Sequence, residues 1–345
     1  MTLKAAVVSV LAALVVPAGA QSEVRVRELM IVDKSAGQLV RLNLADGTVT
    51  ARIGVGFGPH EVITVAGQRS PTGGPLAVVS LYGTGPRPGS AVALVDLVSG
   101  AVSEVSIAPF TRPHGLAHVP GTSLVLVTAE AQDSVVVVDV SEAAMAGSVA
   151  IGSSTPHMVV AAPDGAAGYV SAIAGGSVAR VGVPGYRVTS APVGPGAEGI
   201  ALSSDGATVW VGSNDSDSVY VVDAQTLEEL HVLDTCGVPI RVTAVGTGLM
   251  AATCMNDAQV QLFDTTTYDL MATVTLPALS RAAATGITPE FRQTLAKGLR
   301  LVRRVPRDLP PIWADELRVF QILEKLLANA ISFTDAGEIT VSGAF

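Results

Sequence analysis

The chain has 345 residues, and its 21 Lys and Arg against 30 Asp and Glu give a formal net charge of −9. This balance argues against nucleic-acid binding by the chain as a whole, because the neutralisation of phosphates needs clustered cations. Hydrophobic residues make up 49% of the chain and charged residues 15%, so it can bury a large core and does not have the composition of a disordered protein.

Residues 2–20 are uncharged apart from Lys4 and end in Ala18, Gly19 and Ala20. A short apolar stretch that follows a basic residue and closes on small residues is typical of a secretory signal peptide. The alternative is an uncleaved anchor helix, but the stretch is short for a span that needs ~20 apolar residues. We therefore predict a cleaved signal peptide over 1–20, an exported mature chain from Gln21, and no membrane association after cleavage.

One short motif recurs five times, and its copies begin at Pro59, Pro113, Pro156, Ala197 and Pro239. The last four starts follow one another at intervals close to forty residues. Between the copies lie β-branched runs separated by Gly, Asn, Asp and Ser, for example residues 124–140, 208–233 and 249–276. Such runs predict short strands. Four strands for each forty-odd residues is the spacing of β-propeller blades, so we predict an all-β propeller over 21–280.

The repeated pattern combines a V-x-V-x-D strand, an Asp-Gly turn after the inner strand, and a Gly/Pro-rich lead into the next copy. It resembles the YVTN family of seven-bladed propellers over residues 28–276. The resemblance implies the fold and says little about function, because this family mixes binding modules, surface proteins and a few enzymes.

The repeat count predicts an incomplete first blade. A unit of three outer strands begins near residues 29, 76, 124, 168, 208 and 249, whereas the inner-strand motif occurs only five times. We therefore predict six partial blades, of which the first lacks its inner strand. An open ring leaves unpaired strand edges, so either the propeller is truncated or a downstream strand, such as residues 338–342, takes that place.

The composition changes at about residue 280. Residues 281–345 carry a net charge of +2 (9 − 7), whereas residues 21–280 carry −12 (11 − 23). Residues 297–343 predict a strand, a Pro-rich turn, an amphipathic helix, a turn and a strand. This segment resembles the start of the ATP-binding domain of sensor histidine kinases, including its N-box, at these positions: Asp315, Arg318, Gln321, Asn329, Ala330, Phe333 and Thr334.

The resemblance implies that Asn329 is the Mg²⁺ ligand beside the nucleotide phosphates. Lys325 and Ser332 replace the usual Asn and Lys of the pattern, and the sequence reaches Phe345 before the motifs that hold adenine. One Asn cannot supply the oxygen ligands that Mg²⁺ and bridging phosphates need. We therefore interpret 281–345 as an incomplete kinase-like fragment and expect neither ATP–Mg binding nor kinase activity. A degenerate fusion of a propeller sensor with a histidine kinase remains an alternative.

Three of the five histidines, His60, His114 and His157, occupy the same repeat position, and Glu198 and Ile240 follow in the next two copies. Equivalent positions in successive blades lie at one end of the central channel, so we expect these side chains to converge there. Imidazoles and a carboxylate suit a transition metal or an anionic ligand. The alternative is structural, with each His bonded to the backbone of a neighbouring blade.

The remaining polar candidates are interpreted as structural. His118 is expected in the core and His231 on an outer, solvent-facing strand, and residues 214–218 fit a blade hairpin better than a calcium loop. Cys236 and Cys254 are expected at the same end of one blade, with Cys254 opposite Ile240, which permits a disulfide if the Cα separation is under ~7 Å.

The sequence contains no G-x-S-x-G, Walker-A or H-E-x-x-H motif. The first hypothesis is therefore an exported binding or scaffold protein that holds a small molecule or a protein partner at the channel face. The second is a metal-dependent enzyme, a lactonase-like hydrolase or an oxidoreductase, that uses the channel-mouth set His60, His114, His157 and Glu198. No cofactor is predicted except a transition metal at the channel mouth.

Overall fold

The computed structural model describes residues 28–44, 46–70, 73–275, 300–304 and 338–342. It divides into two units, one that contains β1–β23 and one that contains β24 (Arg300–Arg304) and β25 (Glu338–Ser342). In these residues no helix has the length and apolar character to cross a membrane. The predicted signal peptide over 1–20 and Asn329 lie outside the described residues.

The first unit consists of six antiparallel sheets. The first sheet has three strands: β1 (Glu28–Asp33), β2 (Gln38–Asn43) and β3 (Val49–Gly54). The other sheets have four strands each: β4 (Pro59–Arg69), β5 (Pro75–Gly83), β6 (Pro88–Asp96) and β7 (Val102–Ser106); β8 (Pro113–His118), β9 (Leu124–Ala129), β10 (Ser134–Asp139) and β11 (Ala144–Ala150); β12 (Pro156–Ala161), β13 (Ala167–Ala172), β14 (Ser177–Gly182) and β15 (Val188–Pro192); β16 (Ala197–Leu202), β17 (Thr208–Ser213), β18 (Ser218–Asp223) and β19 (Glu229–Asp234); β20 (Pro239–Ala244), β21 (Leu249–Cys254), β22 (Gln259–Asp264) and β23 (Leu270–Thr275).

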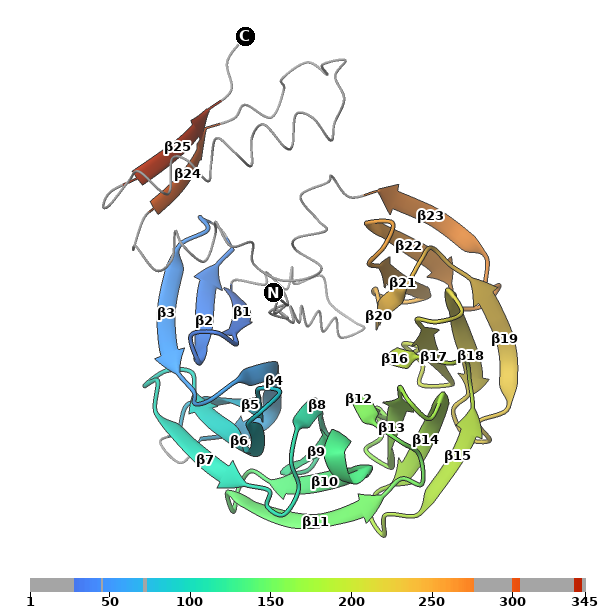
Figure 1. Ribbon diagram of the computed structural model, residues 1–345, viewed down its shortest axis with the longest axis horizontal. Coiled ribbons are helices and arrows are strands. Elements are labelled where there is room, and N and C mark those ends of the chain that lie inside the picture. The colour runs from blue at the N-terminus through green and yellow to red at the C-terminus, as the bar shows by residue number, and fades with distance from the viewer. Residues whose placement is uncertain (1–27, 45, 71–72, 276–299, 305–337, 343–345) are drawn as a thin grey trace. The chain divides into compact units, whose positions relative to one another are not determined.

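The sheets follow one another around a centre, with β4, β8, β12, β16 and β20 innermost (Figure 1). This is a β-propeller, as predicted. The count of strands also agrees, because the first sheet contains β1–β3 and no inner strand within the described residues. Residues 338–342, which the sequence suggested as a replacement strand, form β25, and this strand pairs in parallel with β24.

Small and β-branched side chains pack the faces of neighbouring sheets together. Val78, Val127 and Val136 are fully buried in a cluster shared by the sheets of β4–β7 and β8–β11. Trp210 is also fully buried, between the last two sheets. Because each sheet presents alternating residues to both neighbours, the Val-rich runs of the sequence fill the separate clusters between successive sheets.

Every inner strand contains an irregularity just after its first residue. The register of pairing with the second strand shifts between Pro59 and Val62, and β8, β12 and β16 repeat this shift at their equivalent residues. In β20 the shift falls between Pro239 and Arg241. A bulge leaves residues out of the ladder and re-aims their side chains. The bulge in β20 also corrects the prediction that Cys254 lies opposite Ile240, because Cys254 pairs with Pro239.

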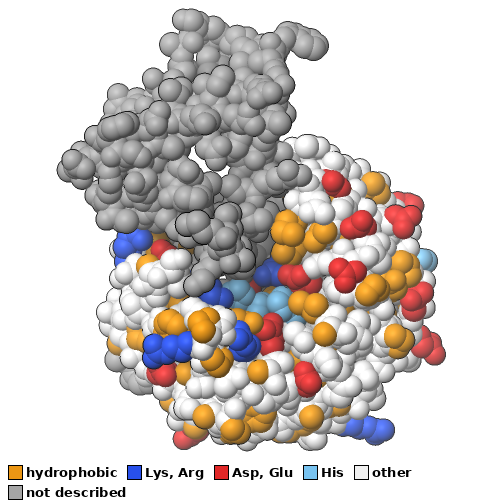
Figure 2. Space-filling model, viewed as in Figure 1, with side chains coloured by type: hydrophobic (Ala, Val, Ile, Leu, Met, Phe, Trp, Pro, Cys, Tyr) orange, Lys and Arg blue, Asp and Glu red, His pale blue; other side chains and the backbone are white. Residues whose placement is uncertain are grey.

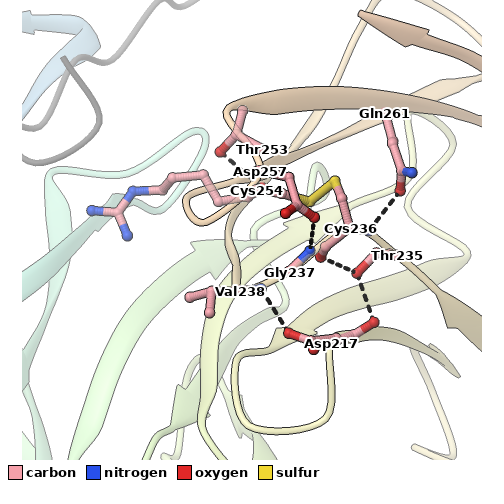
Figure 3. The surroundings of a disulfide bond; sticks show 10 residues. Asp217, Thr235, Cys236, Gly237, Val238, Thr253, Cys254, Asp257 and Gln261 are labelled. Atoms are coloured by element: carbon pink, nitrogen blue, oxygen red, sulfur yellow. Dashed lines mark hydrogen bonds between the residues drawn. A yellow bond between two sulfur atoms is a disulfide. The ribbon is translucent and has the colours of Figure 1, made fainter. Parts of the chain in front are cut away.

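A disulfide joins Cys236 and Cys254, whose Cα atoms are 5.6 Å apart (Figure 3). Nearby hydrogen bonds fix the same segment: the Cys236 amide donates to the Gln261 side chain over 3.1 Å, and the Gly237 amide donates to Asp257 over 2.6 Å. The disulfide therefore ties the residues that precede β20 to the end of β21.

Candidate functional site

The bulges place one polar side chain from each of four sheets at the centre of the propeller. His60, His114, His157 and Glu198 directly follow the first residue of β4, β8, β12 and β16. Figure 2 shows the histidines grouped near the centre of one face, with acidic and basic side chains beside them. We call this region the hub.

The three imidazoles are in direct contact. Nε2 of His60 lies 2.6 Å from Nε2 of His114, and the ring centroids of His114 and His157 are 3.7 Å apart. Both His60 and His114 are buried, with exposed fractions of 5% and 3%. Sequence reasoning expected these side chains to converge, and the structure brings them together.

Hydroxyl groups on the second strands hold this arrangement. The Gly115 amide donates to Oγ1 of Thr128 over 2.7 Å, and the same hydroxyl donates to the carbonyl of His157, also over 2.7 Å. Ser171 repeats the bridge, because its hydroxyl accepts from the Met158 amide and donates to the carbonyl of Glu198. Each hydroxyl therefore links its own inner strand to the next one.

Burial lowers the pKa of His60 to about 2 and lowers that of His114 well below its usual value, and the neighbouring charges add to both shifts. These two imidazoles are therefore neutral near pH 7 and can offer nitrogen lone pairs. The alternative that each His bonds to the backbone of a neighbouring blade does not describe them, because their hydrogen bonds in the described residues go to side chains.

His157 lies in a different environment. Its Nδ1 is 2.7 Å from Oε1 of Glu130, and its Nε2 is 3.5 Å from Oε1 of Glu198. Burial lowers the pKa of His157, but the two carboxylates outweigh burial and leave the pKa raised. Burial likewise raises the pKa of Glu198, while the bond to His157 and the charges nearby leave it lowered. His157 therefore lies between two carboxylates that favour the protonated form of its ring.

A second group of hub side chains was missed by sequence reasoning. Lys34, Tyr82, Glu130 and Asn214 each lie at or just past the end of the strand that follows an inner strand, or of its counterpart β1. The Tyr82 hydroxyl donates to Oε2 of Glu130 over 2.6 Å, and the Asn214 side chain donates to Glu198. Their position in the sequence could have identified these residues, because all four occupy the same place in the repeat.

Another group that sequence reasoning missed follows the His position by one residue. Glu61 on β4 and Arg241 on β20 are 180 residues apart in sequence, yet the guanidinium of Arg241 donates to Oε1 of Glu61 over 3.0 Å. Arg241 also lies 3.7 Å from Glu198. The bulge explains why adjacent residues such as His60 and Glu61 both serve the hub.

Two sets of hub residues could hold a metal ion. The ligand atoms of His60, Glu61 and His114 all lie within 4.8 Å of one another, and so do those of His114, Glu130 and His157. Glu198 belongs to neither set and instead contacts His157, Asn214 and Arg241.

The other sequence candidates lie away from the hub. Nε2 of His118 is 2.9 Å from the Thr122 carbonyl, and His231 is exposed on the outer strand β19, against Tyr268. Residues 214–217 form the turn between β17 and β18, as the hairpin interpretation predicts.

Comparisons with known proteins show the fold and leave the activity open. No protein-family model matches the chain. Virginiamycin B lyase from Staphylococcus aureus superposes with a TM-score of 0.59 at 12% identity, covering 72% of this chain and 80% of that one. A streptogramin B lyase gives 0.59 at 14% identity, covering 72% and 79%.

The curated relatives are sensory kinases, and each matches this chain over a short part of its length. The adaptive-response sensory kinase SasA of Crocosphaera subtropica is 36% identical over 96 residues, which are 27% of this chain and 22% of the kinase. The SasA of Gloeothece citriformis is 47% identical over 47 residues, 13% of this chain and 12% of that kinase. The chain thus spans about a fifth or less of these relatives, which lends weak support to a kinase-like fragment.

Proposed function

We propose that this chain is an exported propeller that binds a small anionic molecule at the hub. The observation that carries this proposal is a pair of cations beside the histidines. Nζ of Lys34 lies 4.4 Å from the centroid of the Tyr82 ring, and the guanidinium of Arg112 lies 5.3 Å from the same centroid.

Within the described residues, neither cation forms an ion pair with a carboxylate. Lys34 contacts Nδ1 of His60 at 3.3 Å, and Arg112 donates to the carbonyl of Gly85 over 2.8 Å. Arg241, by contrast, is already bridged to Glu61 and Glu198. Two half-buried cations beside one aromatic ring, in a chain with a net charge of −9, form a local site for a carboxylate or phosphate group.

A small molecule fits this position better than a protein partner does, because Lys34 and Arg112 are half-buried beside the buried histidines. Shielding from water strengthens the attraction between these cations and an anion.

The test is a thermal-shift titration of the EDTA-treated full chain with inorganic phosphate and with benzoate. We expect a saturable rise in the melting temperature. Lys34→Gln and Arg112→Gln should each weaken binding by about tenfold or more, because a hydrogen bond to a charged group contributes about 1.5–3 kcal/mol. Arg52→Gln, which changes an exposed cation on β3, is the matched control and should bind normally. Equal loss in the control, or no saturable shift, would contradict the proposal.

A second candidate is an enzyme, and the carboxylate-bound imidazole of His157 favours it. A histidine held by carboxylates at both nitrogens is a candidate acid in proton transfer. The two structural neighbours are lyases by name, so other chains with this fold carry catalysis. Turnover of a lactone panel that is lost in His157→Gln but kept in His231→Gln would support this candidate.

A further inference from the structure

We infer that the hub binds one divalent transition-metal ion, with His60, Glu61 and His114 as its protein ligands. The inference concerns the region of the proposed function, but its ligand atoms belong to residues other than Lys34 and Arg112. It starts from the contact between the two Nε2 atoms, which are 2.6 Å apart on buried side chains.

A hydrogen bond alone does not account well for this contact, whichever tautomers the two histidines adopt. If Lys34 donates to Nδ1 of His60, then His60 carries its proton on Nε2 and donates to His114. The proton of His114 must then sit on Nδ1, a buried atom without a hydrogen-bond partner in the described part of the chain. With the opposite tautomers, the Nδ1–H of His60 points at the Lys34 amine. Each arrangement leaves one polar group badly placed, and a buried donor without a partner is costly.

A metal ion uses the same two nitrogens without a proton between them. Two imidazole nitrogens bound to one tetrahedral ion stand roughly 3.3 Å apart, given metal–nitrogen bonds of about 2.0–2.1 Å. The observed 2.6 Å contact would therefore lengthen by roughly 0.7 Å when a metal binds.

Glu61 completes the ligand set. It is buried, with an exposed fraction of 4%, and its carboxylate lies within 4.8 Å of the ligand atoms of both histidines. Arg241 bonds to Oε1 of Glu61 and so orients the carboxylate, as outer-shell partners of metal ligands do.

The second set of candidate ligands, His114, Glu130 and His157, is less suitable. His157 already has a carboxylate oxygen at each ring nitrogen, at 2.7 and 3.5 Å. Glu130 also accepts the Tyr82 hydroxyl. Both groups are therefore engaged, whereas His60 and His114 turn their Nε2 atoms toward each other.

The donor set limits the kind of metal. Two imidazoles and one carboxylate suit Zn²⁺, Co²⁺, Ni²⁺ or Fe²⁺, while Mg²⁺ and Ca²⁺ prefer oxygen ligands alone. Three protein ligands leave a coordination position for water or a bound anion, which is the pattern of reactive rather than structural metal sites.

The test is a Co²⁺ titration of the EDTA-treated full chain, followed by visible absorption, together with elemental analysis. We expect one equivalent of Co²⁺ per chain with the spectrum of a nitrogen-ligated ion. His60→Ala and His114→Ala should lose the bound equivalent. His118→Ala and His231→Ala remove the two histidines outside the hub and should retain it. Circular dichroism of each metal-free variant separates loss of binding from loss of folding.

Carboxylate variants identify the third ligand without removing an imidazole. Glu61→Gln should weaken Co²⁺ binding at least tenfold and change the spectrum, while Glu130→Gln should stay within about threefold of the parent protein. The reverse pattern would overturn the assignment. So would a parent chain that retains no Co²⁺, or retention of the bound equivalent by His114→Ala.

Lys34 separates this inference from the proposed function. With the metal bound through Nε2, the Nδ1–H of His60 faces Lys34, and a glutamine carbonyl at this position would accept its hydrogen bond, which an ammonium group cannot do. Lys34→Gln should therefore tighten Co²⁺ binding about tenfold while it weakens phosphate binding. Phosphate is measured after EDTA treatment, so either proposal can fail alone. Weaker Co²⁺ binding in Lys34→Gln would contradict the metal site.

Discussion

At the scale of single residues, the hub depends on how closely neighbouring inner strands approach. A Cβ atom added to Gly115 would lie 2.7 Å from the carbonyl oxygen of His157 and 2.8 Å from Cα of Met158. Both are backbone atoms that cannot rotate away. The glycine after His114 therefore lets β8 and β12 come close enough for their imidazole rings to be in contact.

Gly115→Ala should destabilise the protein by about 1–3 kcal/mol, as overpacking does, and should separate His114 from His157. Urea unfolding followed by circular dichroism measures the change. Gly54→Ala is the matched control, since a Cβ there meets nothing within 4 Å, and it should change stability by less than about 0.5 kcal/mol. If Gly115→Ala were as mild as this control, the close approach would not matter for folding.

At the scale of elements, the third strand of several sheets ends in an Asp that closes the turn to the fourth. Oδ1 of Asp223 accepts the amides of Gln225 and Thr226, each over 2.8 Å, and Asp264 repeats this with Thr266 and Thr267. The V-x-V-x-D pattern thus has a physical basis, because the carboxylate satisfies amides that the strand ladder leaves unpaired.

The backbone bonds from Thr226 and Gln225 lower the pKa of Asp223. A carboxyl whose folded pKa is lowered stabilises the fold above its unfolded pKa of ~3.9 and loses that contribution as pH falls through the folded pKa. Asp223→Ala should therefore cost about 1 kcal/mol at pH 7 and progressively less below about pH 4. Urea titrations at several pH values measure this, with the exposed Asp234→Ala as the control. A cost that persists at low pH would show that the charge is not responsible.

At the scale of the whole propeller, the sheet of β4–β7 and the sheet of β20–β23 lie at a long sequence separation but meet at the hub. The bond between Arg241 and Glu61 joins the first inner strand to the last, across 180 residues. The first sheet has no inner strand in the described residues, so this polar contact is one of the interactions that hold distant parts of the ring together.

A double-mutant cycle with Glu61→Gln and Arg241→Met tests this link in EDTA-treated protein. The two single changes should each lower the free energy of unfolding, and their coupling should be about 0.5–3 kcal/mol, as found for residues in one ionic network. Additive effects, measured by urea unfolding, would mean that the two side chains do not support each other.

Much of this architecture could be predicted from the sequence. Local patterns specified the strands, the five inner-strand motifs and the short first sheet, because strand period and turn chemistry are local properties. The proximity of His60, His114 and His157 could also be predicted, because a repeat places equivalent residues at equivalent points around one axis.

Only the tertiary structure shows which side chains surround these three imidazoles. Lys34, Tyr82 and Glu130 carry no motif of their own, and the pairing of Arg241 with Glu61 joins residues that no local rule relates. The bulges also shifted Cys254 onto Pro239 by one register step, which strand alternation could not reveal. Repetition along the chain therefore determined the fold, while the arrangement of the sheets around one centre determined the contents of the site, because this arrangement brings residues far apart in sequence within bonding distance.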